Sequence, residues 1–121
     1  MTLKLVPFIL QHHWWPDLKL HHWDLRIATG LPYFHLVCLQ NPLQGDTECF
    51  LKYCYEEKFF GLGSSKPERL PPWSPENPYP YPSLIETIER GLASFRRTEI
   101  YLRGKKKNYV LSIPPFKVEL K

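Results

Sequence analysis

The sequence has few cysteines and no long hydrophobic run. Its three cysteines, at positions 38, 49 and 54, form no C-x-x-C pair. An odd count without an export signal predicts reduced, mostly buried thiols, and argues against a cysteine-ligated zinc site. No stretch approaches the roughly 20 apolar residues that span a bilayer. Lys4 and Pro7 interrupt the apolar residues near the start, unlike a signal peptide. We therefore expect a cytoplasmic protein without membrane contact.

What the sequence does contain indicates one compact, folded domain. Its 121 residues suit a single core, so we treat residues 1–121 as one domain. The hydrophobic fraction of 43% and the aromatic fraction of 15% are too high for a disordered chain. A formal net charge of +4 favours anionic partners but identifies none, because solubilising lysines give the same balance.

Short segments of alternating polarity predict a mainly β fold. Residues 3–13 are rich in strand-forming types, and Pro7 suggests an edge strand, with a turn at 14–17. Residues 18–29 alternate with period two, which places His22, Asp24 and Arg26 on one face of a strand. Further strands are expected at residues 33–40, 47–55, 99–103, 108–113 and 116–120.

Two segments differ from the others. The Ser-Leu-Ile-Glu sequence at residues 83–86 fits a helix capping box, and Gly91 fits the end of one short helix. Residues 63–82 are rich in proline, which predicts an extended surface loop that covers the domain rather than a partner-binding motif. The expected architecture is a small closed or partly closed β-barrel with one short helix and a Pro-rich loop.

Most of the side chains that could bind a metal lie in a short stretch: His12, His13, His21, His22 and Asp24. Imidazole and carboxylate together suit Mn²⁺, Fe²⁺, Zn²⁺ or Co²⁺. His22 and Asp24 are two residues apart on a predicted strand, so their side chains share a face with Cα atoms about 6–7 Å apart. Arg26 continues the row, and a cation beside a guanidinium is suited to holding a phosphate.

Other interpretations of this row remain open. His22 and Asp24 also fit a hydrogen-bonded surface pair, with Arg26 in a solvated salt bridge. A non-haem iron oxygenase would need a second histidine far along the chain, and no histidine follows His35.

Two parts of the sequence resemble the DNA ligase D 3′-phosphoesterase family. Residues 8–13 read Phe-Ile-Leu-Gln-His-His, and residues 22–26 read His-Trp-Asp-Leu-Arg with Gly30 following. That family has three hydrophobic residues before Gln-x-His, a short arm, His-(aromatic)-Asp-Leu-Arg and a glycine-containing turn. Residues 100–104 and 109–111, joined by a lysine-rich turn, are similar to its closing hairpin.

The resemblance implies a metal-dependent enzyme of DNA repair, with manganese the expected ion and zinc or cobalt as alternatives. It implies removal of 3′-terminal ribonucleotides and 3′-phosphates from DNA or RNA-tipped DNA, alongside a separate ligase and polymerase. The metal ligands would be His13, His22 and Asp24; His22, Asp24 and Arg26 would be catalytic, with Arg26 on the phosphate.

This sequence departs from the family at two points. The arm between the first two histidines is longer, so His12 or His21 could replace a neighbour as ligand. The family's later histidine is missing, and Lys52 lies in the corresponding region as a second phosphate contact. These departures leave two alternatives: a catalytically degenerate module that binds nucleic-acid ends, and a structural metal-binding domain.

Four side chains are weaker candidates for nucleic-acid binding. Trp14 and Trp15 could stack on bases, although packing is the more common role for tryptophan. Arg103 and Lys105 could contact a phosphate backbone, although basic turns often serve solubility alone.

Overall fold

The computed structural model describes residues 5–29, 33–44, 48–54, 66–74, 77–96, 99–105, 108–112 and 117–118, and they form one nine-stranded sheet. No described residue is helical, so this part of the chain holds no helix that could cross a membrane. The strands are β1 (Val6–Trp15), β2 (Leu20–Ile27), β3 (Tyr33–Cys38), β4 (Cys49–Cys54), β5 (Glu68–Leu70), β6 (Ser83–Arg96), β7 (Glu99–Arg103), β8 (Asn108–Ser112) and β9 (Lys117–Val118).

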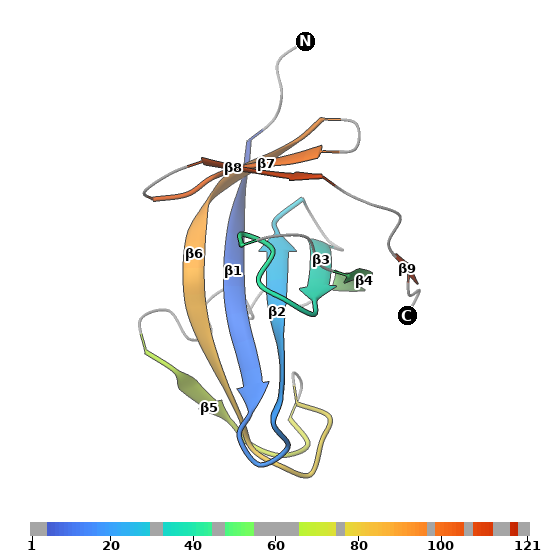
Figure 1. Cartoon of the computed structure of the whole chain (residues 1–121), viewed down its shortest axis with the longest axis vertical. Coiled ribbons are helices and arrows are strands. Elements are labelled where there is room, and N and C mark those ends of the chain that lie inside the picture. The colour runs from blue at the N-terminus through green and yellow to red at the C-terminus, as the bar shows by residue number, and fades with distance from the viewer. Residues whose placement is uncertain are drawn as a thin grey trace.

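The sheet runs in the order β8-β7-β6-β1-β2-β3-β4-β9, and only the β4–β9 pair is parallel. One edge of β6 pairs with β1. Along the other edge, β6 pairs with β5 near its start and with β7 near its end. Figure 1 shows β7 and β8 lying across the upper ends of β1 and β6, so the sheet curls into a half-barrel. The predicted mainly β, partly closed barrel is confirmed.

β1 is an internal strand, and the prediction that it lies at an edge is wrong. It pairs with β2 on one side and β6 on the other. Pro7 is tolerated because it is the second residue of the strand, where one missing N–H costs little, and its carbonyl still accepts from the amide of Ala28 (2.8 Å). Trp14 and Trp15, which we expected in a turn, extend β1, and Lys19 provides the left-handed residue of the turn (φ 53°).

The hydrophobic core uses one face of β1 and β2. Leu10 lies opposite Leu25, and Phe8 opposite Ile27, with all four buried. Leu36, Cys38, Ala93, Ile100 and Leu102 complete this core from β3, β6 and β7. Because side chains alternate along a strand, the intervening residues Gln11, His13, Asp24 and Arg26 occupy the opposite face.

The predicted helix at residues 83–91 is wrong, because this segment belongs to β6. The capping-box pattern is local, whereas β6 gains backbone hydrogen bonds along both of its edges from β1, β5 and β7. Gly91 does not end a helix. A Cβ there would overlap the backbone carbonyl of Arg103, so glycine allows β6 and β7 to approach.

We expect Gly91→Ala to destabilise the fold by about 3 kcal/mol or more, because the added methyl group meets a backbone oxygen that a side-chain rotation cannot move. Urea unfolding would measure this. Ile88→Ala, on an exposed part of the same strand, is the control and should cost about 1 kcal/mol or less. Equal effects of the two substitutions would contradict the close approach of β6 and β7.

Candidate metal centre

Three predicted ligands converge on the polar face of β1 and β2. His13 and His22 are directly opposite each other across the two strands, and Asp24 follows His22 on the same face. One possible ligand atom from each residue lies within 4.8 Å of the others. The tight turn at residues 16–19 fixes this register, because it pairs Trp15 with Leu20 and hence His13 with His22.

The distances fit one bound cation. Nε2 of His22 is 3.0 Å and Nδ1 of His13 is 3.7 Å from Oδ2 of Asp24. Nitrogen and oxygen ligands about 2.0–2.2 Å from an ion at ordinary angles are separated by about 3.0–3.5 Å. Because the three possible ligand atoms lie up to 4.8 Å apart, the side chains must move about 1–2 Å closer together to reach one ion.

Two further polar atoms of this group are held by neighbouring residues. Nε2 of His13 is 2.8 Å from Oγ of Ser83 on β6. Nε2 of His35 on β3 donates to Oδ1 of Asp24 at 2.7 Å, on the carboxylate oxygen that faces away from His22. Metal-binding histidines and carboxylates commonly have such second partners, which fix their orientation.

Asp24 is a buried, ionised carboxylate. Only 1% of it is exposed. Burial alone would raise its pKa, but the positive field of His22 and the contacts from His13, His22 and His35 lower the pKa well below the ordinary value. The carboxylate therefore carries its charge at neutral pH, as a metal ligand must.

Arg26 lies beside the three ligands but is fully buried, with 0% exposure. Its Nε donates to Oε1 of Gln11 at 2.7 Å, and its terminal nitrogen is 3.8 Å from Oδ2 of Asp24. The alternative interpretation placed His22 and Asp24 in a hydrogen-bonded surface pair, with Arg26 in a solvated salt bridge. The hydrogen bond between His22 and Asp24 is present (3.0 Å), but the surface location is wrong because Asp24 and Arg26 are both buried. The guanidinium holds Gln11 and neighbours Asp24, whereas its predicted contact with phosphate stays a prediction.

Trp15 and Asn77 form one wall of the site. The Trp15 ring packs against the rings of His13 (centroids 4.1 Å apart) and His22 (5.4 Å), and its Nε1 donates to Oδ1 of Asn77 at 2.7 Å. The Asn77 amide donates to the carbonyls of Leu70, Pro71 and Tyr81. The Pro-rich segment is thus more than a surface loop, because its described residues include β5 and the buried Asn77.

Of the remaining predicted residues, Trp14, Arg103 and Lys105 do not join the centre. Trp14 and His12 stack on the opposite face of β1. The side chain of Lys52 lies outside the described part of the structure, although its backbone pairs with His35. Arg103 pairs with Leu92, which pairs with Pro7, six residues before His13. That spacing puts Arg103 and its neighbour Lys105 about 20 Å along the strand from the site.

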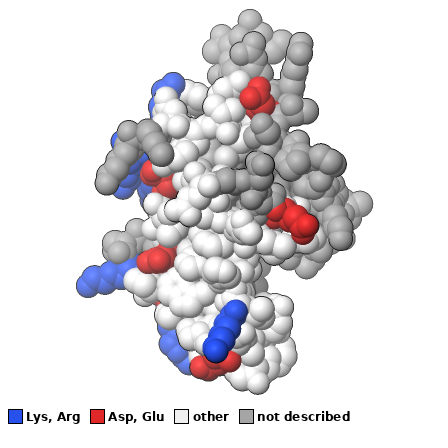
Figure 2. All heavy atoms as spheres, viewed as in Figure 1, with Lys and Arg blue, Asp and Glu red and all other residues white. Residues whose placement is uncertain are grey.

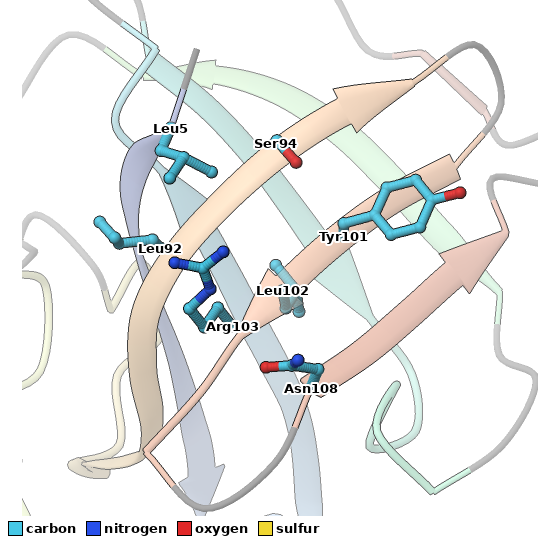
Figure 3. Close-up of a pocket in the computed structure, with 7 residues that line it drawn as sticks. All are labelled: Leu5, Leu92, Ser94, Tyr101, Leu102, Arg103 and Asn108. Atoms are coloured by element: carbon cyan, nitrogen blue, oxygen red, sulfur yellow. The ribbon is translucent and has the colours of Figure 1, made fainter. Parts of the chain in front are cut away.

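Arg103 instead lines a hollow of about 270 Å³ at the far end of the sheet, together with Leu5, Leu92, Ser94, Tyr101, Leu102 and Asn108 (Figure 3). The face in Figure 2 carries basic and acidic side chains interspersed, and its described residues form no continuous basic surface there.

His12 and His21 cannot replace His13 or His22 as ligands, because strand alternation points them to the other face. Burial, followed by the neighbouring histidines His21, His22 and His13, lowers the pKa of His12 to about 4. Residues 14–21, which separate His13 from His22, complete β1, form the turn and begin β2, and so leave these two histidines on the same face.

In comparisons with known proteins, the chain matches no family model, no curated protein and no solved structure. The resemblance on residues 8–13 and 22–26 stays a prediction.

We expect Asn77→Ala to destabilise the protein by about 2–4 kcal/mol, because it removes several buried hydrogen bonds and leaves carbonyls and an indole N–H without their partner. Urea unfolding would measure the loss. The matched control is Asn41→Ala, which removes one bond, from the amide of Leu43 in a half-buried turn, and should cost about 1 kcal/mol. Similar losses would contradict the role of Asn77 as the link between Trp15 and the Pro-rich segment.

Proposed function

We propose that this chain is a metal-dependent phosphoesterase that acts on 3′ ends of DNA or RNA-tipped DNA, with His13, His22 and Asp24 as ligands. The observation that carries the proposal is the convergence of two imidazoles and one ionised carboxylate within 4.8 Å. The substrate class comes from the resemblance to the DNA ligase D 3′-phosphoesterase family. Manganese is the expected ion, and a separate ligase and polymerase would use the healed end in DNA repair.

A bound divalent ion would supply Lewis acidity toward a phosphoryl oxygen. The protein's own residues supply the charge and the orientation that such an ion needs. Asp24 supplies negative charge, Ser83 and His35 keep His13 and Asp24 oriented, and Arg26 adds positive charge beside the carboxylate. Positive charge near the reacting phosphate stabilises the charge that accumulates there during hydrolysis.

Access to the site favours approach over His22. The side chain of His22 is 22% exposed, whereas those of His13 and Asp24 are almost fully buried. A terminal phosphate is smaller than an internal one flanked by two nucleotides, so a site reached past one side chain suits a strand end.

We expect release of inorganic phosphate from a 3′-phosphorylated DNA strand in the presence of Mn²⁺. His22→Ala and Asp24→Asn should each lower this rate by at least about 100-fold, because losing even a partner of a ligand typically costs 10–100-fold in metal affinity or activity. The measurement is a phosphate-release assay with a parallel assay on a strand that ends in one ribonucleotide.

The matched control is Asp17→Asn, which changes an exposed aspartate in the β1–β2 turn and should leave the rate unchanged. Wild-type release no faster than the buffer background with Mn²⁺, Zn²⁺ and Co²⁺ would refute catalysis. Unchanged rates in both site variants would assign the activity to other residues.

The full burial of Arg26 favours a second candidate, in which the site binds metal and strand ends without turnover. A guanidinium that cannot reach solvent supports the fold of the site and does not contact a reacting phosphate, whereas a strand end held through the metal alone would not need it. This candidate predicts salt-sensitive binding of a 3′-phosphorylated strand and no phosphate release.

Both candidates require metal binding, which thermal melting would test separately. At Mn²⁺ or Zn²⁺ concentrations 100-fold above the dissociation constant, the wild type should gain about 2.7 kcal/mol, seen as a higher melting temperature. With Mn²⁺, Asp24→Asn should lose this gain and Asp17→Asn should keep it. A melting temperature unaffected by any of these ions would remove the metal from both candidates.

A further inference from the structure

A second pair of histidines lies on the opposite face of the β1–β2 hairpin. Nε2 of His12 and Nδ1 of His21 are 3.1 Å apart. His12 pairs with Trp23 and His21 with Trp14 in the β1–β2 register, so the two histidines are diagonal neighbours on one face. This face is separate from the one that presents His13, His22 and Asp24.

We propose that His12 and His21 form a second metal site that binds a divalent ion of the Zn²⁺, Ni²⁺ and Cu²⁺ class. Two imidazole nitrogens about 2.0–2.1 Å from one ion, at neighbouring coordination positions, are separated by about 2.9–3.4 Å. The observed separation of 3.1 Å lies in this range. Imidazole ligands favour these ions over Mg²⁺ or Ca²⁺, and water completes the coordination.

The surrounding aromatic rings hold His12 in place before any ion binds. Its ring stacks on Trp14 (centroids 4.8 Å apart) and on Trp23 (4.6 Å), at interplanar angles of 22° and 17°. A ring held by two stacking neighbours loses little side-chain entropy on binding, which favours affinity. His21 is exposed and provides the route from solvent.

A carboxylate on the neighbouring strand adds favourable charge. Glu86 on β6 lies directly opposite His12 in the β1–β6 register, on the same face. Cβ atoms of such partners are about 4.5–5.5 Å apart. A carboxylate whose side chain begins this close stabilises a bound cation, so Glu86→Gln should weaken binding without abolishing it.

The test counts equivalents of Ni²⁺ bound by the metal-free protein, using isothermal titration calorimetry. Wild type should bind two, one at each face. His21→Gln removes an exposed ligand with little risk to folding, and should lose one equivalent or weaken it by at least about 100-fold. His22→Ala should lose the other, and the double variant should bind neither. Leu20→Gln, an exposed change beside His21, is the matched control and should keep both.

Tryptophan fluorescence gives a second measurement. In the His22→Ala background Ni²⁺ should still quench emission, because Trp14 and Trp23 flank the second site, and adding His21→Gln should abolish the quenching. A single wild-type equivalent that His22→Ala removes would refute the proposal and leave His12 and His21 as a hydrogen-bonded pair. An equivalent that survives in the double variant would assign it to other groups and also refute the proposal. Neither outcome depends on phosphate release, so this experiment tests the second metal site independently of the phosphoesterase proposal.

Discussion

The ionised carboxylate of Asp24, buried in the sheet, is the constraint on which the polar face depends. A charge removed from water is costly unless neighbouring groups compensate it. His22 and His35 contact the two carboxylate oxygens, His13 and Arg26 lie close by, and Gln11 in turn holds Arg26. Strands β1, β2 and β3 each contribute to this shell. The group thus stabilises the buried charge and could also hold a metal ion. The two roles are compatible because a cation would replace compensation that histidines now supply.

Strand alternation explains why the four histidines of β1 and β2 form two groups. On β1 and β2, adjacent histidines point to opposite faces, so His13 and His22 meet on the polar face and His12 and His21 on the other. The turn at residues 16–19 sets the register, and a slip of one residue would break both pairs at once. The histidine pairs at residues 12–13 and 21–22 therefore lie opposite each other across the hairpin. The geometry of the turn thus determines which histidines meet on each face.

The sequence predicts much of this arrangement, and the omissions have physical causes. Period-two alternation correctly places His22, Asp24 and Arg26 on one face of β2. It places Leu25 and Ile27 on the other face, because a strand has only two faces. The prediction of a helix from residue 83 is wrong because a capping box reflects only a local preference. Backbone hydrogen bonds along both edges of β6 favour the strand instead. Ser83 and Asn77 join the site through contacts over 70 and 62 residues, which no local pattern reveals. His35 could have been found, since a hairpin through the turn after Ile27 places it opposite Arg26.

The Pro-rich segment connects the fold to access at the site. Proline has no backbone N–H, so a Pro-rich segment has few backbone donors and relies on side chains to fix its path. Asn77 does this by donating to three carbonyls while accepting from the Trp15 indole. Trp15 in turn packs on His13 and His22, the two imidazoles of the candidate centre. The wall of the site therefore depends on a segment that is distant in sequence from His13, His22 and Asp24. A substitution at Asn77 would displace the Trp15 ring, and this ring would in turn shift the two imidazoles that it contacts.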